Sequence, residues 1–191
     1  MTATEPLYPT PGQTIGPFFG FALPYERGNQ LLPPGHPEAV ELWGIVRDGH
    51  GQPIPDAMVE IWQADGDGEV TRHGGALQRD GHTFTGFGRV GTDNNGRYSF
   101  TTRVPGRSAE GRPRFIAMTI FARGLTNRLF TRIYLPEDED LFERDDVLAG
   151  LPAARRDTLI AKRVDGGYQF DVNMQGEEET VFLRYTRHPA Q

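Results

Sequence analysis

The segment from Leu42 to Asp65 constrains the fold more than any other part of the chain. Its sequence, LWGIVRDGHGQPIPDAMVEIWQAD, begins with an apolar, partly β-branched run that favours a pleated strand. Glycines and prolines crowd residues 48–55 and require a turn. After that turn Val59, Ile61 and Gln63 fall on one side of an extended chain, in strict alternation with their neighbours. The segment therefore predicts two strands joined by a tight connection, a β-hairpin of the kind found in all-β sandwiches.

Composition agrees with an all-β fold. A chain of 191 residues suits one domain with a substantial core, and its 37% hydrophobic and 24% charged residues, with 12 Phe and 24 Gly, fit strands joined by many turns. We expect a β-sandwich of mixed and antiparallel strands with long loops, an extended N-terminal arm and at most short helices. The arm is expected to cover residues 1–40, and a single β-sandwich domain residues 41–191.

Charge and residue usage exclude several classes of function. A net charge of -6 and a pI near 5.4 lack the basic footprint that nucleic acid or an anionic membrane requires, so we expect neither as a partner. The absence of cysteine removes disulfides and thiolate chemistry. The first thirty residues show no signal-peptide pattern, and no apolar run approaches the ~18 residues of a membrane span. A cytoplasmic location is the resulting expectation.

Apolar alternation and turn residues predict the remaining strands. They are expected at residues 98–102, 114–122, 128–135, 158–163, 168–174 and 180–185. Between them, residues 66–88 are expected to form a long polar loop and residues 136–157 a solvated loop with a short helix. The polar loop contains His73 and His82, but no further ligands follow at a recognisable spacing, so we expect no metal there.

The pattern G-x-V-x-D-x-x-G-x-P-I-P-x-A-x-V-E-I-W-Q-A-D, which begins at Gly44, resembles the signature segment of the intradiol ring-cleaving dioxygenases. These are non-haem iron enzymes that open catechol rings between the two hydroxyl groups. A looser form of the pattern occurs in small carrier-type β-sandwich modules, which are a rival interpretation. The resemblance extends from about Pro9 to Leu183, further than a carrier module would reach.

The resemblance implies two tyrosine and two histidine ligands in family members that bind ferric iron. The first tyrosine would end a G-x-Y triplet, where this chain has Val70, and the second would follow a P-G pair, where it has Ser108. The histidines would stand two apart after an R-P pair, where this chain has Phe115 and Ala117. Alkyl and benzyl groups offer no lone pair to a metal. We therefore expect this chain to bind no iron itself.

Two further motifs resemble the iron-free chain of two-chain family members. The T-x-G-P segment of Thr14, Gly16 and Pro17 is similar to an arm that reaches the partner's active site. The F-A-R-G segment, which contains Arg123, is similar to one whose arginine lies beside the substrate pocket. An arginine can hold a carboxylate through paired donors in a planar fork. The resemblance thus implies that these four residues contact an aromatic dihydroxybenzoate. From the residues alone, the arginines of segment 123–132 are more typical of a solvated face.

Three functions remain after these observations. The first is an iron-free subunit without catalytic residues of its own, joined to a homologous beta chain that supplies ferric iron and its ligands for an O2-dependent ring cleavage. The second is a self-sufficient dioxygenase, which would need the four missing ligands. The third is a non-enzymatic carrier sandwich. For Arg112, which belongs to the R-P pair, we expect a structural role.

Overall fold

The computed structural model describes residues 16, 19–71 and 79–185. The strands within these ranges are β1 (Val40–Arg47), β2 (Met58–Trp62), β3 (Phe87–Gly91), β4 (Arg97–Thr102), β5 (Phe115–Phe121), β6 (Leu129–Tyr134), β7 (Lys162–Val164), β8 (Gly167–Gln169) and β9 (Val172–Asn173). The helical elements described are α1 (Phe19–Ala22), the 3-10 helix η1 (Pro136–Arg144) and α2 (Ala153–Asp157). No helix in the described part of the chain is both long enough and apolar enough to span a membrane.

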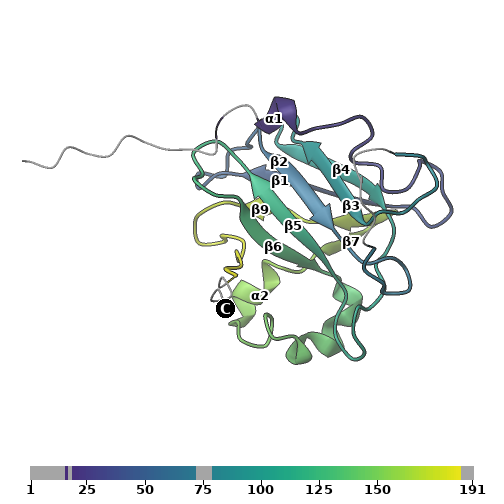
Figure 1. Ribbon diagram of the computed structural model, residues 1–191. Helices are drawn as coiled ribbons and strands as arrows, with labels where there is room; N and C mark the ends of the chain where they lie inside the picture. Colours follow the sequence, from purple (N-terminus) through teal and green to yellow (C-terminus); the bar gives the residue numbers. More distant parts are fainter. Residues whose placement is uncertain (1–15, 17–18, 72–78, 186–191) are drawn as a thin grey trace, which may run out of the picture.

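The strands form two sheets. One has the order β4-β1-β8-β7, with β9 also paired to β1, and the other has the order β3-β2-β5-β6. Strand β1 runs antiparallel to β4 and parallel to β8 and β9, whereas the pairs within the second sheet are antiparallel. Figure 1 shows the sheets together, with α1 at one end and η1 and α2 at the other. The predicted β-sandwich of mixed and antiparallel strands with only short helices is confirmed.

Alternating side chains from both sheets build the core. On β4 every second residue is buried, as predicted for residues 98–102, and on β5 the buried positions are the even-numbered ones. The largest fully buried apolar side chains include Leu42, Phe100, Ile116, Met118 and Ile120. Each such side chain contributes about 1.5–3 kcal/mol on burial. Because the even positions of β5 face the core, its odd positions, including residues 115 and 117, lie on the outer face of the second sheet.

The predicted hairpin between β1 and β2 is wrong. The connection starts as a tight turn, in which Asp48 N donates to Gln52 O over 2.9 Å and Ile54 N donates to Val46 O over 2.9 Å. The chain then crosses to the other sheet, because prolines 53 and 55 have no N–H to continue the ladder. Alternation in β2 fits either sheet equally well, so the pattern identified the strands and not their pairing.

Two other segments also differ from expectation. Strand β3 begins inside the expected loop 66–88, where its glycines hid it: a Cβ on Gly88 would come within 2.6 Å of Leu31, so the residue permits close packing. Residues 180–185 do not form a strand and make a single bridge, between Leu183 and Phe130. In both cases tertiary contacts override the local pattern.

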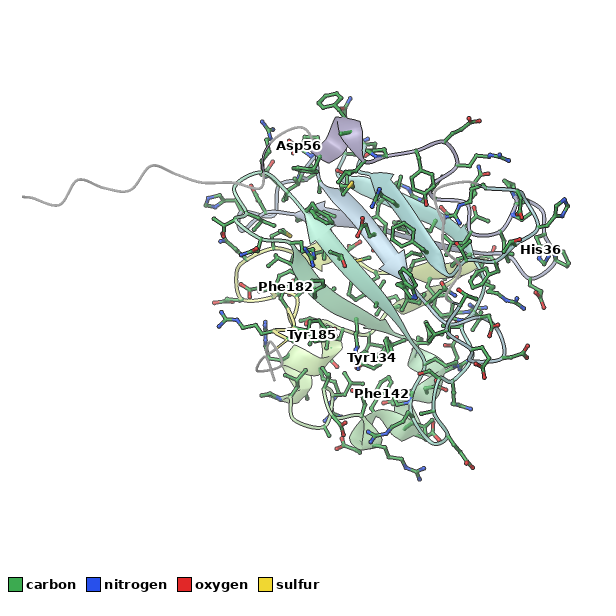
Figure 2. The ribbon with its side chains drawn as sticks, in the orientation of Figure 1. His36, Asp56, Tyr134, Phe142, Phe182 and Tyr185 are labelled. Carbon is green, nitrogen blue, oxygen red and sulfur yellow. The ribbon has the colours of Figure 1, made fainter. Side chains whose placement is uncertain are left out.

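Residues 136–157 are not the solvated loop that their charges indicated. They close a second apolar cluster formed by Tyr134, Phe142, Leu148 and Leu159. The rings of Tyr134 and Phe142 meet edge to face with centroids 6.3 Å apart (Figure 2). The Tyr134 hydroxyl donates to Asp145 Oδ1 over 2.8 Å, and burial raises the pKa of this phenol, so it remains a donor. The acidic run therefore supplies one cap of the sandwich.

Replacing Tyr134 by Phe is expected to lower the free energy of unfolding by about 1.5–3 kcal/mol, because the buried hydroxyl donates one hydrogen bond to Asp145 and accepts one from Arg132, and both partners are charged. Urea unfolding of the two chains measures this difference. Tyr168→Phe is the matched control, because the Tyr168 hydroxyl meets the more exposed Glu137 at 3.1 Å. An equal loss of stability in both variants would contradict the expectation that the buried Tyr134 hydroxyl contributes more than the Tyr168 hydroxyl.

Candidate functional site

The family resemblance predicts metal ligands at four positions, which are called the ligand positions here and hold Val70, Ser108, Phe115 and Ala117 in this chain. The two loops next to Val70 and Ser108 pack directly against each other. Gly106 N donates to Asp65 O over 2.6 Å, and a Cβ on Gly68 would come within 2.1 Å of Arg107 O. Asp65 shapes the first loop, because its carboxylate accepts the backbone N–H groups of residues 67 and 69. Val70 follows the first loop and Ser108 follows the second. The exposed Val70 presents only an isopropyl group to its surroundings.

Replacing Gly106 by Ala is expected to destabilise the protein by about 2 kcal/mol, because overpacking here cannot be relieved by a flexible side chain. The added Cβ would meet Gly68 N at 2.3 Å and Gly66 O at 2.5 Å, both backbone atoms. Thermal unfolding measures the loss. Gly20→Ala is the matched control, since a Cβ added at Gly20 would project into open space, with nothing within 4 Å. A loss no greater than that of the control would show that the loops separate freely.

The other two ligand positions lie on the outer face of β5. Ala117 stands opposite Trp62 of β2 and opposite Arg132 of β6, and Phe115 stands opposite Tyr134. Residues two apart on a strand project to the same side, so Phe115 and Ala117 share a face, as the strand periodicity predicted. The Phe115 ring packs on Tyr134 with centroids 5.9 Å apart. These two positions therefore present a ring and a methyl group.

A buried carboxylate ties this region together. Asp138 of η1 is fully buried and accepts hydrogen bonds from Arg114 N, Nε and Nη2 over 2.7, 2.8 and 3.0 Å, together with one from Arg107 Nη2. Burial by itself raises the pKa of the Asp138 carboxyl, but the hydrogen bonds from the two arginines outweigh it, and the pKa lies below its ordinary value. Arg107 and Arg114 directly precede Ser108 and Phe115. Asp138 thus holds the loop of Arg107 and the start of β5 together at one end of the sandwich.

A shallow basin of about 510 Å³ opens between these elements. Its lining includes Asp67, Arg107 and Arg114 together with Gly66 and residues 104–106 of the two loops. The residues at the ligand positions do not fit ferric iron, which prefers phenolate, imidazole and carboxylate donors: Ser108 alone carries an oxygen. Across the ranges that the structure describes, no three or more His, Cys, Asp or Glu side chains gather as a metal site would require.

Arg112 contacts the residues at the end of η1. Its Nη1 donates to the Arg144 carbonyl and lies 3.1 Å from Asp146 Oδ1. These contacts connect the loop before β5 to the end of η1, and a structural role for Arg112 stays a prediction.

Arg123 lies at the opposite end of β5 from the ligand positions. It comes eight positions after Phe115, which is about 26 Å along an extended chain. Its guanidinium forms an ion pair with Asp56 and its side chain is 66% exposed. Figure 2 labels Asp56 beside α1, at the top of the view. Within one chain, Arg123 therefore cannot act at the basin, and its guanidinium faces outward.

Part of the predicted arm site lies beside Arg123. Phe19 of α1 packs against Phe121, two residues before Arg123, with ring centroids 6.3 Å apart. Gly16 precedes α1 with φ near +93°, in the region that favours glycine. Thr14 and Pro17, the other two predicted contact residues, lie outside the described residues. The structure thus brings α1, the start of the described arm, to the end of the sandwich where Arg123 lies, whereas Glu38 farther along the arm pairs with Arg103 near the basin.

Sequence reasoning missed Asp138 and the cluster around Tyr134. Asp138 falls within an acidic run, where charge alone indicated solvent exposure. The signal that could have found it is the pair Arg107 and Arg114, which flank two ligand positions and require a nearby anion once buried. Arg132 was noted only as part of a charged hairpin, although its guanidinium lies over the Phe115 ring.

Comparison with known proteins identifies the family. Residues 15–176 match the family model described as Dioxygenase. The chain belongs to the intradiol ring-cleavage dioxygenase family. It is 39% identical to the protocatechuate 3,4-dioxygenase alpha chain of Burkholderia cepacia, over 91% of this chain and 96% of that one. The alpha chain of Pseudomonas putida is 37% identical over 95% of this chain and 98% of that one.

More distant relatives share part of the chain or only the fold. The protocatechuate 3,4-dioxygenase beta chain of Burkholderia cepacia is 34% identical over 77% of this chain and 68% of that one. Among solved structures, catechol 1,2-dioxygenase from Pseudomonas arvilla C-1 superposes with a TM-score of 0.53 at 23% identity, over 75% of this chain and 54% of that one. The second similarity concerns the β-sandwich fold alone.

Proposed function

We propose that this chain is the iron-free alpha subunit of a two-chain protocatechuate 3,4-dioxygenase. A homologous beta chain would bind ferric iron, and the pair would cleave protocatechuate with O2 to 3-carboxy-cis,cis-muconate. The observation that carries the proposal is the state of the four ligand positions, where Val70, Ser108, Phe115 and Ala117 cannot form a ferric site. The extended similarity to two alpha chains supports it.

The partner's iron would activate the bound catecholate toward dioxygen, and this chain would shape the pocket. Its arm, proposed to span residues 1–40 ahead of a sandwich domain at 41–191, would place Thr14, Gly16 and Pro17 against the partner's active site. Phe21 of α1 is 88% exposed and would then be covered by the partner. Obligate interfaces are large and apolar, which suits such a residue.

Arg123 would bind the substrate's carboxylate. A guanidinium carries five N–H donors in a planar fork, so Arg123 can remain paired with Asp56 through one edge and donate to a substrate carboxylate through another. Fixing the ring substituent fixes the ring, and small misplacements of a reacting group can cost ~100-fold in rate. This chain would therefore contribute orientation, and the partner the reactive metal.

Activity of the separate and combined chains tests the proposal. The chain is expressed alone, and also together with an iron-bearing beta chain of the same organism. Protocatechuate consumption and oxygen uptake are measured in each preparation. We expect turnover only in the combined preparation, with both chains in one complex. Ring cleavage by the isolated chain would favour a self-sufficient dioxygenase, and a stable monomer that never pairs would favour a carrier module.

A further inference from the structure

A permanently charged group already lies beside two of the four ligand positions. Arg132 of β6 stands directly opposite Ala117 of β5, and opposite residues of an antiparallel pair project to the same face. The guanidinium carbon of Arg132 lies 4.2 Å from the centroid of the Phe115 ring. The Arg132 guanidinium therefore lies next to both residue 115 and residue 117.

The position of this guanidinium is held by a partly buried network. Arg132 Nη1 donates to Tyr134 Oη over 3.1 Å and lies 3.7 Å from Asp145 Oδ2. Asp145 is itself fixed, because its Oδ1 accepts the Tyr134 hydroxyl and the backbone N–H groups of Val147 and Leu148. With three-quarters of the Arg132 side chain shielded from solvent, the guanidinium has defined neighbours.

We propose that Arg132 is the resident cation of this face and that it keeps metal ions out of the space beside residues 115 and 117. A guanidinium stays protonated at every physiological pH, and it offers donors but no lone pair. Repulsion between like charges a few ångströms apart is strong where water is partly excluded. This inference rests on the proposed function in one respect: it adds a second barrier to metal binding in a subunit proposed to lack iron.

Zinc binding to an introduced histidine pair tests the inference. Phe115→His with Ala117→His places two imidazoles on one face of β5, and imidazole nitrogens bind zinc. This double variant is compared with the same variant carrying Arg132→Gln, by calorimetric titration with zinc chloride after circular dichroism has checked folding. We expect zinc to bind about tenfold more tightly when Arg132 is absent, and the difference to shrink in about 0.5 M salt.

Arg128→Gln in the double-histidine background is the matched control. Arg128 lies four residues earlier, with its guanidinium over Phe130 and not over Phe115. Its removal should leave zinc affinity within about twofold of the double variant, because a screened charge one Debye length away has little effect. An equal gain from Arg128→Gln and Arg132→Gln would overturn the assignment to Arg132.

Two other outcomes also overturn the inference. One is equal zinc affinity with and without Arg132, and the other is no binding in either folded variant, since another feature would then exclude metal. Should Phe115→His prevent folding, Ala117→His with Thr119→His provides a second pair on the same face and keeps Phe115. The iron content of the unaltered chain is measured alongside: stoichiometric iron would contradict the proposed function, whereas an iron-free chain with equal zinc affinities would contradict only the role of Arg132.

Discussion

Replacing Asp138 by Asn is expected to lower the free energy of unfolding by about 3 kcal/mol, the lower end of the range for breaking a buried ion pair. The carboxylate is fully buried, and its loss leaves the cations of Arg107 and Arg114 without their shared anion. Arg107 is half-exposed and can turn to water, which keeps the expected cost from being larger. For a chain of this length the melting temperature should fall by roughly 6–12 °C.

The control is Asp140→Asn, two residues away in the same acidic run and exposed to solvent. A surface change of this kind stays within about 0.5 kcal/mol. Equal melting temperatures of Asp138→Asn and Asp140→Asn would contradict the account of the buried carboxylate.

The difference in the free energy of unfolding between the wild type and Asp138→Asn is also expected to depend on pH. The pKa of Asp138 is lower in the folded chain than in the unfolded one, so its contribution is fully present above the unfolded value of about 3.9. It disappears as pH falls through the folded pKa, where the carboxylate takes up a proton. Urea unfolding should give a constant difference between about pH 5 and 7 and a narrowing one below about pH 4.

Replacing Arg123 by Leu in the assembled enzyme is expected to raise KM for protocatechuate by roughly 30–100-fold. The change removes hydrogen bonds to a charged group, which contribute about 2–3 kcal/mol. The assay is steady-state kinetics on the complex of both chains. Affinity for 4-hydroxybenzoate should fall in parallel, and affinity for phenol should stay the same, because only the first carries a carboxylate.

Arg128→Leu provides the control for this substitution. It removes another exposed arginine near the same hairpin, at a position that the proposal does not use. Its KM should match that of the wild type. Unchanged kinetics of Arg123→Leu, or an equal loss of affinity for phenol and 4-hydroxybenzoate, would remove Arg123 from the substrate site.

The sequence predicted the sandwich because alternation in β4, β5 and β6 reflects which side chains reach the core. Which strands pair with each other could not be predicted from alternation. Met58–Trp62 shows the same pattern whether it pairs with β1 or with β5, and the choice depends on where the prolines of the connection send the chain. Phe87–Gly91 was hidden because two of its five residues are glycines, which are chosen for close packing and carry no apolar signal.

The candidate site divides in the same way. Substitutions at residues 70, 108, 115 and 117 could be identified from the sequence, since each stands within or shortly after a recognisable pair or triplet. The contacts around these positions could not be identified from the sequence. Asp138 binds Arg107 and Arg114 from more than 20 residues away along the chain, and its neighbours in the sequence are exposed acids. The stacking of Arg132 on Phe115 depends on strand register across β5 and β6, which a single sequence does not specify.

The distribution of iron between separated chains tests the central claim most directly. The complex is prepared by co-expression, its two chains are separated, and each is analysed for iron content and visible absorbance. Iron and a tyrosinate-to-iron charge-transfer band should remain with the beta chain, and this chain should be colourless and iron-free. One equivalent of iron with the same visible band in this chain would contradict the account.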